Sequence, residues 1–147
     1  MKLTVAWIGK RKNPAIQSLT DEYLKRLRQY AETDGLPVKD EAALLKLYGR
    51  HGRGNRGRLV LLDSRGKQLS SEELAQFLQE HQDRNPLPLV FGVGGADGFT
   101  AEALAQADFT LSLGKMTVAH ELARVVLLEQ LYRAFTILKG HPYHLGH

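Results

Sequence analysis

The sequence predicts an α/β protein with a single domain, in which a mostly parallel sheet has helices on both faces. Strand-like runs alternate with helix-like segments along the chain, as consecutive βα units require. The run LVLLD at 59–63 is continuously apolar, which is typical of a strand buried on both faces. A length of 147 residues with 43% hydrophobic content suits one compact core.

The first half of the chain predicts two strands and two helices. An apolar run indicates a strand over 3–8, and apolar residues at helical spacing indicate a helix over 16–30. A glycine and a proline then break the helical pattern, and a weak second strand is expected near Val38. A short helix over 41–48 completes this half.

Residues 49–58 have the sequence GRHGRGNRGR, which is rich in glycine and arginine and has no apolar side chain. This composition is typical of an exposed, mobile loop. The net charge of +4 and the pI near 9.4 favour a polyanionic partner such as RNA. The arginines of this loop would contact the phosphates of that partner. The candidate contacts are Arg50, Arg53, Arg56 and Arg58. A solvated linker explains the same composition.

The second half predicts three strands and three helices. The strands are expected over 59–63, 89–93 and 109–113, and the helices over 74–81, 100–106 and 119–138. Ser70 and Glu73 form a capping-box pattern before the first of these helices, and Gly140 ends the last one. We expect the last helix to bury Leu122, Val125, Val126, Tyr132 and Phe135.

The glycine cluster at 92–98 does not match the known phosphate-binding loops. The G-x-G-x-x-G fingerprint needs glycine where Asp97 stands. Gly114 and Lys115 do not form a P-loop, because Met116 occupies the position of the required Ser or Thr. Dinucleotide binding and nucleoside triphosphate hydrolysis are therefore disfavoured. What remains is a loop that lets the backbone approach a flat ligand, or a bare turn.

The composition also excludes several kinds of site. The absence of cysteine rules out disulfides, thiolate metal sites and cysteine nucleophiles. No apolar run approaches the roughly 18 to 20 residues of a membrane span, and the first apolar stretch is too short for a signal peptide. We therefore expect a cytoplasmic protein without a membrane span or a bound metal.

Several motifs together resemble one family. They are FGVGGADG at 91–98, LSLGKMTVAHELARVVLLEQLYRA at 111–134 and HPYH at 141–144, with weaker support from KLTVAWIGK at 2–10 and EYLKRL at 22–27. In this combination the chain is similar to the pseudouridine N3-methyltransferases of the ribosomal large subunit, small members of the SPOUT methyltransferase superfamily. The resemblance covers nearly the whole chain. The segment 38–58 departs from it, since it is shorter than the family usually has.

The resemblance implies one SPOUT domain over 1–147 whose carboxy-terminal segment is threaded as a trefoil knot, a rare exception to unknotted topology. In the family this knot binds S-adenosylmethionine. The corresponding positions here are Leu62, Gly95, Leu113, Gly114, Lys115, Met116, Thr117 and Val118. Apolar side chains and close-approaching backbone suit an adenine ring, and the same side chains also suit an ordinary core.

The resemblance also implies a reaction: the cofactor's methyl group passes to N3 of a pseudouridine in 23S rRNA, within the assembled ribosome. Such a transfer needs aligned reactants and removal of the N3 proton. The candidate catalytic residues are Arg133, Tyr143, His144 and His120. The family works as a homodimer in which one subunit's tail completes the other's site. We expect Tyr143 and His144 to point away from their own core, because Pro142 cannot continue the helix.

Two other functions fit parts of the sequence. A non-catalytic basic RNA-binding module would use residues 49–58 without chemistry. A small hydrolase would use His120 with Asp63 or Asp97, although no nucleophile motif such as G-x-S-x-G is present. The candidate catalytic residues also have purely structural explanations. His120 can be a packed histidine at a helix end, Arg133 can form a solvated ion pair on the helix surface, and the tail can be disordered.

Overall fold

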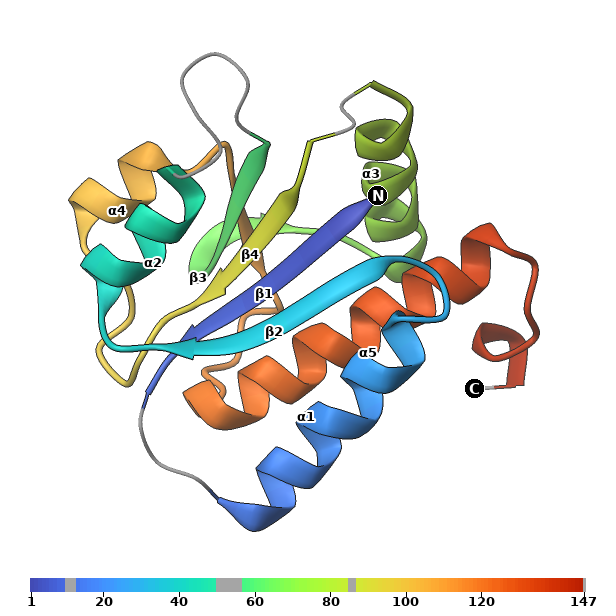
Figure 1. Cartoon of the computed structure of the whole chain (residues 1–147), viewed down its shortest axis with the longest axis horizontal. Helices are drawn as coiled ribbons and strands as arrows, with labels where there is room; N and C mark the ends of the chain where they lie inside the picture. Colours follow the sequence, from blue (N-terminus) through green and yellow to red (C-terminus); the bar gives the residue numbers. More distant parts are fainter. Residues whose placement is uncertain (10–12, 50–56, 85–86, 147) are drawn as a thin grey trace.

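The computed structural model describes residues 1–9, 13–49, 57–84 and 87–146, in which a five-stranded sheet lies between two layers of helices (Figure 1). The strands are β1 (Lys2–Ile8), β2 (Glu32–Val38), β3 (Arg58–Gln68), β4 (Leu89–Val93) and β5 (Phe109–Ser112). The helices are α1 (Pro14–Leu27), α2 (Glu41–Gly49), α3 (Ser71–Arg84), α4 (Ala101–Gln106) and α5 (His120–Leu138), and a short 3-10 helix, η1 (His144–Gly146), follows them.

All the strands run parallel, in the order β2-β1-β4-β3-β5. Parallel pairing needs a crossover between paired strands, and helices supply it here. The predicted α/β class is therefore confirmed. The weak strand expected near Val38 is a full edge strand, because β2 pairs with β1 from Glu32 onward. Pro37 fits this position, since an edge strand leaves one side of its backbone unpaired.

Local sequence signals start several of the helices, among them α1 and α3. The Asn13 side chain accepts hydrogen bonds from backbone N–H groups in the first turn of α1, and Pro14 takes the first helical position. Before α3, Ser70 and Glu73 form the expected capping box, in which each side chain accepts from the other residue's backbone N–H. Within the described ranges, no helix is long and apolar enough to cross a membrane.

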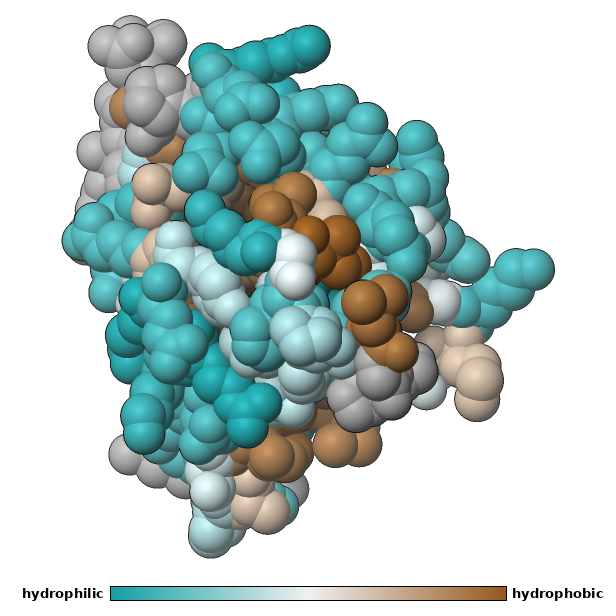
Figure 2. Space-filling model, turned by 90° about the vertical axis from the view of Figure 1, so that its right-hand side faces the viewer, coloured by the Kyte–Doolittle hydropathy of each residue, from teal (hydrophilic) through white to brown (hydrophobic). Residues whose placement is uncertain are grey.

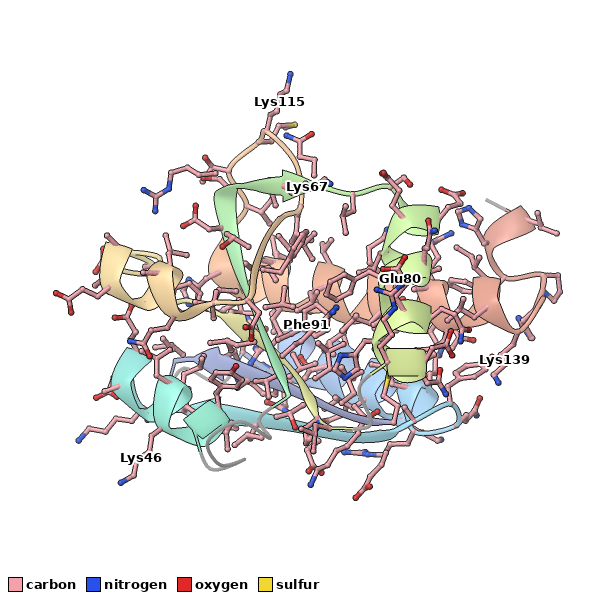
Figure 3. The ribbon with its side chains drawn as sticks, turned by 90° about the horizontal axis from the view of Figure 1, so that it is seen from above. Lys46, Lys67, Glu80, Phe91, Lys115 and Lys139 are labelled. Atoms are coloured by element: carbon pink, nitrogen blue, oxygen red, sulfur yellow. The ribbon has the colours of Figure 1, made fainter. Side chains whose placement is uncertain are left out.

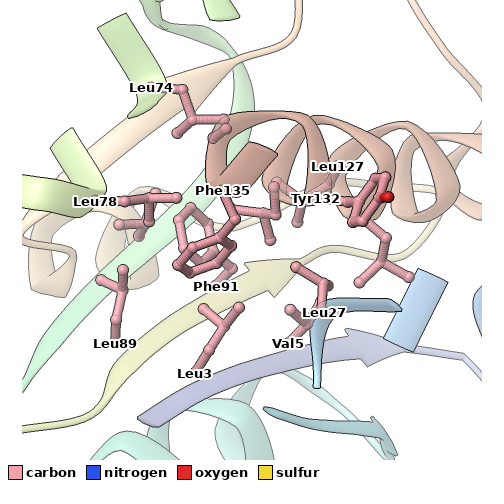
Figure 4. Close-up of a cluster of buried hydrophobic side chains, with 14 of the residues drawn as sticks. Leu3, Val5, Leu27, Leu74, Leu78, Leu89, Phe91, Leu127, Tyr132 and Phe135 are labelled. Atoms are coloured by element: carbon pink, nitrogen blue, oxygen red, sulfur yellow. The ribbon is translucent and has the colours of Figure 1, made fainter. Parts of the chain in front are cut away.

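The sheet buries side chains on both faces, as strand alternation requires. Leu3 and Val5 of β1 belong to the larger core, with α1, α3 and α5, whereas Ala6 belongs to a smaller core with α2 and α4. Figure 4 shows the larger core, in which Phe91 of β4 and Phe135 of α5 lie together between sheet and helix. These two cores hold the helices against the sheet, and the loops that join helices to strands at the sheet's edge are positioned by this packing.

Helix α5 buries a different stripe from the predicted one. Leu122 and Val126 are 51% and 41% exposed, whereas Tyr132 and Phe135 are buried as expected. The residues that face the sheet are Leu127, Leu128 and Leu131. The prediction was wrong because apolar residues occupy most of the circumference of this helix, so the pattern alone does not fix the buried side. The surface of α5 is therefore partly apolar.

Strand β3 continues past the predicted end at Asp63 and curls around β5. Leu111 of β5 pairs with both Leu62 and Lys67, so the intervening residues form an irregularity in the ladder. Gly66 makes the close approach possible, because a Cβ there would lie 2.6 Å from the Thr110 carbonyl oxygen. The curl places the end of β3 beside the segment that follows β5. The trefoil threading itself stays a prediction from the resemblance.

Most of the predicted arginine-rich loop, including Arg50, Arg53 and Arg56, lies outside the described residues. Arg58 is described and begins β3. Its backbone N–H donates to the Pro88 carbonyl, and its guanidinium lies 5.6 Å from the centroid of the Phe77 ring. Arg58 is therefore packed on the sheet and does not belong to a loop.

Candidate functional site

The irregular middle of β3 and the carboxyl ends of β4 and β5 surround a cavity of about 540 Å³. Open α/β sheets bind ligands at this edge, because the loops of neighbouring strands meet there. The walls come from 62–65, 93–98 and most of 111–119, and the first turn of α5 closes one side. The volume lies within the range of roughly 300–1,000 Å³ that is typical of small-molecule sites.

The predicted cofactor-binding residues gather at this cavity, with one exception. Those that line it are Leu62, Gly95, Leu113, Gly114, Met116, Thr117 and Val118. Lys115 does not line it, and its side chain points away from the body of the molecule (Figure 3). The side chain of Met116 is 83% exposed, so an apolar rim borders the cavity on the solvent side.

The loop after β4 is a tight glycine turn. The Gly98 N–H donates to the Gly95 carbonyl over 3.0 Å, and Gly98 has a φ of +72°, a conformation that favours glycine. A Cβ on Gly94 would lie 3.2 Å from the Gly98 carbonyl carbon, whereas a Cβ on Gly95 would meet only Ile8, at 3.6 Å. Gly94 and Gly98 therefore serve the turn, whereas Gly95 lines the cavity without being required for the turn.

The loop after β5 is fixed by a side chain that the sequence analysis did not single out. The buried Ser112 hydroxyl donates to the Gly114 carbonyl over 2.9 Å and accepts from the Gly114 N–H over 3.1 Å. Gly114 has a φ of +145°, which side chains rarely tolerate. The backbone after Gly114 is thereby held against the cavity.

A charged pair lies on the wall that β3 contributes. Asp63 accepts hydrogen bonds from the Arg65 backbone and guanidinium, both over 2.9 Å. The Arg65 guanidinium holds the pKa of the Asp63 carboxyl below its usual value. Asp63 is thus paired with Arg65, and among the described residues no hydrogen bond joins His120 to Asp63 or Asp97, the two acids of the hydrolase hypothesis. Among the described residues, no group of His, Asp and Glu side chains is placed to hold a metal.

Of the predicted catalytic residues, only His120 lines the cavity. Arg133, Tyr143 and His144 gather near the other end of α5. His120 and Arg133 are thirteen residues apart on this helix, which corresponds to about 20 Å along its axis. Within one chain, the fold therefore separates two groups of residues that the resemblance assigns to one site shared between subunits.

The distant group, which we call the tail cluster, consists of Glu72, Glu129, Arg133, Tyr143 and His144. The Arg133 guanidinium contacts both Glu129 carboxylate oxygens, at 3.3 and 2.8 Å, and the hydrogen bond raises the pKa of Arg133. Its Nη1 lies 3.0 Å from His144 Nδ1, and His144 Nε2 lies 2.8 Å from Glu72. A guanidinium only donates, so His144 Nδ1 accepts and Nε2 carries the proton toward Glu72.

The expectation that Tyr143 and His144 point away from their own core was wrong. The Tyr143 ring lies edge-on to Tyr132, with 4.8 Å between centroids, and burial raises the pKa of Tyr143. The chain reverses at Gly140, which has a φ of +70°. This reversal folds the tail back along α5, so that Pro142 ends the helix without directing the tail into solvent. Around the tail and α3 the surface is largely hydrophilic, with a small group of apolar side chains (Figure 2).

The structure also singles out Arg124, to which the sequence analysis gave no role. It lies on α5 one turn after His120, and it is buried in the same stripe as the leucines that face the sheet. A charged residue within a buried apolar stripe is the sequence signal that points to Arg124. The sequence pattern did not reveal it, because it predicts a stripe that includes Leu122 and Val126 as the buried side of the helix.

Comparison with known sequences gives consistent matches along the chain. A family model described as "Predicted SPOUT methyltransferase" matches residues 1–144. The protein named ribosomal RNA large subunit methyltransferase H of Koribacter versatilis (strain Ellin345) is 60% identical over 147 residues, which are 100% of each chain. The protein of the same name from Geobacter sp. (strain M21) is 41% identical, over 98% of this chain and 99% of the relative.

Solved structures share the fold at low identity. The SpoU methyltransferase AviRb of Streptomyces viridochromogenes, solved in complex with the cofactor AdoMet, matches 88% of this chain with a TM-score of 0.53 and 13% identity. The chain spans 56% of AviRb. A methylase family protein from Haemophilus influenzae Rd KW20 matches 96% of this chain, and 69% of its own, with a TM-score of 0.59 and 14% identity. Together with the full-length relatives, these matches show that the chain belongs to the SPOUT methyltransferase family, among the ribosomal RNA large subunit methyltransferase H proteins.

Proposed function

We propose that the protein transfers the methyl group of S-adenosylmethionine to N3 of a pseudouridine in large-subunit rRNA, with the assembled ribosome as substrate. The family membership provides the class of reaction. The observation that carries the proposal is the cavity at the carboxyl edge of the sheet, where the glycine turn after β4 faces the loop after β5. Because ribosomes are the substrate, we place the protein in the cytoplasm.

The residues of the cavity fit the cofactor. Leu62, Leu113 and Val118 provide apolar walls for an adenine ring, and the backbone around Gly95 and Gly114 provides hydrogen-bonding groups without side chains in the way. When bound, S-adenosylmethionine supplies a methyl group activated by its sulfonium. The chain's own contribution is to hold this region rigid, through the Ser112 hydroxyl and the glycine turn.

A homodimer would reunite the two separated groups of residues. The exposed Met116, Val118, Leu122 and Val126 extend from the rim of the cavity along α5 and form an apolar surface that a second copy would cover. In a two-fold dimer, α5 of one subunit would cross the partner's α5 in an antiparallel sense along this surface. Such a crossing would bring the tail cluster of each subunit toward the cavity of the other.

In this composite site, we assign to Arg133 and Tyr143 the positioning of the acceptor base. Arg133 keeps its orientation because Glu129 binds its guanidinium at two atoms. His144 connects Arg133 to Glu72, and we assign to it a contact with RNA phosphate or the passage of the N3 proton toward Glu72. His120 stands at the cavity itself, on the cofactor side.

The deciding experiment is mass-spectrometric mapping of large-subunit rRNA from cells with and without this protein. We expect cells that lack it to lose one methyl group on one pseudouridine, and the wild-type gene to restore it. Purified protein, tested with free rRNA, large subunits and assembled ribosomes, then identifies the substrate. An unchanged methylation map would contradict the proposal and favour a non-catalytic RNA-binding module.

A further inference from the structure

The side chain of Arg124 is buried, with 5% of the residue exposed, and it lies outside the tail cluster. Among the described residues, its Nε–H has no hydrogen-bond partner. Its guanidinium lies 4.5 Å from the centroid of the Trp7 ring, a distance at which the ring face attracts a cation. Burial lowers the pKa of Arg124, while the nearby Glu121 carboxylate opposes this effect. The indole thus stabilises the charge, but it does not satisfy the directional N–H donor.

An unpaired donor at such a position points to a missing partner. Buried arginines in folded proteins are almost always paired, and buried polar groups nearly always have a hydrogen-bond partner. The buried Nε–H without a partner destabilises the fold, and it lies on α5, one turn after His120 and at the same edge of the sheet as the proposed cofactor cavity.

A second cavity, of about 100 Å³, lies beside Arg124. It lies at the carboxyl ends of β1 and β4, and Trp7, Gly9, Glu121 and Arg124 are among the residues that line it. Gly94 and His120 line both this cavity and the larger one. Groups bound in the two cavities would therefore be neighbours, as a methyl donor and its acceptor must be.

We infer that this smaller cavity receives the edge of the acceptor pyrimidine ring, and that the Arg124 guanidinium donates to a ring carbonyl oxygen next to N3. The inference rests on the proposed function. The cavity is too small for a nucleotide but suits part of a flat ring, because Gly9 and Gly94 present backbone without side chains. The oxygen that Arg124 binds is one that becomes negative during the reaction.

The chemistry explains why a buried arginine serves here. The N3–H bond gives its proton to a base, either His144 of the tail cluster or solvent water, and leaves its electron pair on the ring. This pair then forms the new N3–C bond as the C–S bond breaks, and the electrons of the C–S bond stay on sulfur. Before transfer, the negative charge of the ring is shared by the carbonyl oxygens that flank N3. A guanidinium held in a site of low dielectric stabilises that charge and favours loss of the proton.

Two substitutions test the inference. Arg124→Met keeps an unbranched side chain of similar length but removes the charge and the donors, and Arg124→Lys keeps the charge without the Nε–H. Arg84→Met, at the exposed end of α3, removes one positive charge elsewhere and serves as the matched control. Each variant is measured for thermal unfolding, for S-adenosylmethionine affinity by calorimetry, and for single-turnover methyl transfer to ribosomes from cells that lack the protein.

We expect Arg124→Met to unfold at a temperature close to that of wild type, because removal of a buried charge and of a donor without a partner offsets the lost contact with the Trp7 ring. Its affinity for S-adenosylmethionine should change less than about twofold, and its methyl transfer should fall about 100-fold or more, as for the loss of an oxyanion donor. Its rate should also continue to rise with pH where the wild-type rate has levelled off, since the ring loses its proton less readily. Arg124→Lys should retain part of the wild-type rate of methyl transfer, and Arg84→Met should retain all of it.

Three results would overturn the inference. A tenfold loss of cofactor affinity in both Arg124 variants would assign the arginine to the cofactor's carboxylate. Full methyl transfer by Arg124→Met would show that the ring does not need the donor. A large loss of stability in both variants, with equal transfer per folded molecule, would make Arg124 structural. If wild-type protein itself transfers no methyl group, the proposed function fails instead.

Discussion

The Tyr143 hydroxyl donates a hydrogen bond of 2.7 Å to Glu129 Oε2, the same carboxylate oxygen that accepts from Arg133 Nη2 over 2.8 Å. Glu129 and Arg133 lie one turn apart on α5, and Tyr143 reaches them from beyond the end of that helix. The carboxylate therefore joins the tail to the helix. The tail has a structural role in its own chain in addition to any role in a partner's site.

Tyr143→Phe should lower the free energy of unfolding by about 0.5–1.5 kcal/mol, because the ring still packs against Tyr132 while Glu129 loses one donor. Urea denaturation measures the change. Tyr30→Phe is the matched control, since this ring stacks on Phe135 and no hydrogen bond of its hydroxyl is found in the described structure. Equal effects of the two substitutions would contradict a stabilising Tyr143–Glu129 bond.

The geometry of the tail cluster determines which subunits can complement each other. Arg133 and His144 of one chain are in contact, so they contribute to the same composite site. Gly95→Val damages only the cavity, and deletion of residues 143–147 damages only the tail cluster. A mixture of these two inactive proteins, after subunit exchange, should recover about a quarter of wild-type activity, because half of the dimers contain one intact site of two.

The negative control for that experiment is a mixture of the truncated protein with Arg133→Ala. Both changes damage the same cluster, so no combination of these subunits contains an intact site and activity should stay absent. Recovery in this second mixture would mean that Arg133 acts in one site and the tail in the other. No recovery in either mixture, with exchange confirmed by mass spectrometry of the dimers, would count against a site shared between subunits.

Gly95→Val should abolish cofactor binding while the fold is retained. The new side chain begins in ordinary contact with Ile8, at 3.6 Å, and extends at the wall of the cavity. Calorimetry with S-adenosylmethionine measures the affinity, and thermal unfolding measures the stability. Gly98→Ala provides the contrast, because its φ of +72° should make alanine cost about 1–2 kcal/mol. Normal cofactor binding by Gly95→Val would show that the adenine lies elsewhere.

His81 should make the protein less stable in mild acid. Its side chain is fully buried in α3, where Nε2–H donates to the Leu87 carbonyl over 2.8 Å. Burial lowers the pKa of His81 in the folded state. As the pH falls through the ordinary histidine value of about 6.5, the unfolded chain binds a proton that the folded chain excludes, so the free energy of unfolding falls.

Denaturation curves between neutral pH and mild acid measure this dependence. His81→Gln retains a donor for the Leu87 carbonyl but does not titrate, so its stability should change less with pH than that of wild type. His141→Gln makes the same substitution at an exposed position and serves as the control. An identical slope for wild type and His81→Gln would assign the acid sensitivity to other groups.

The sequence predicted most of the fold because its signals are local. The capping box at Ser70 and Glu73 and the apolar run at 59–63 depend on neighbouring residues alone, and each appears where it was expected. The candidate cofactor residues also came from a contiguous motif, and all but Lys115 line one cavity. The buried side of α5 was predicted wrongly, because a helix that is apolar nearly all round packs according to its neighbours.

The sequence by itself determined the alternation of strands and helices, the helix starts, the absence of thiol chemistry and the motifs of the family, since each of these is a property of residue types at short spacing. Only the tertiary structure decided that β3 curls around β5 at Gly66, that Tyr143 folds back onto Glu129, and that the Arg124 guanidinium lies over Trp7 with an unpaired Nε–H. These contacts join residues that are far apart along the chain or on separate elements. Packing of whole elements sets such distances, and residue spacing in the sequence does not encode them.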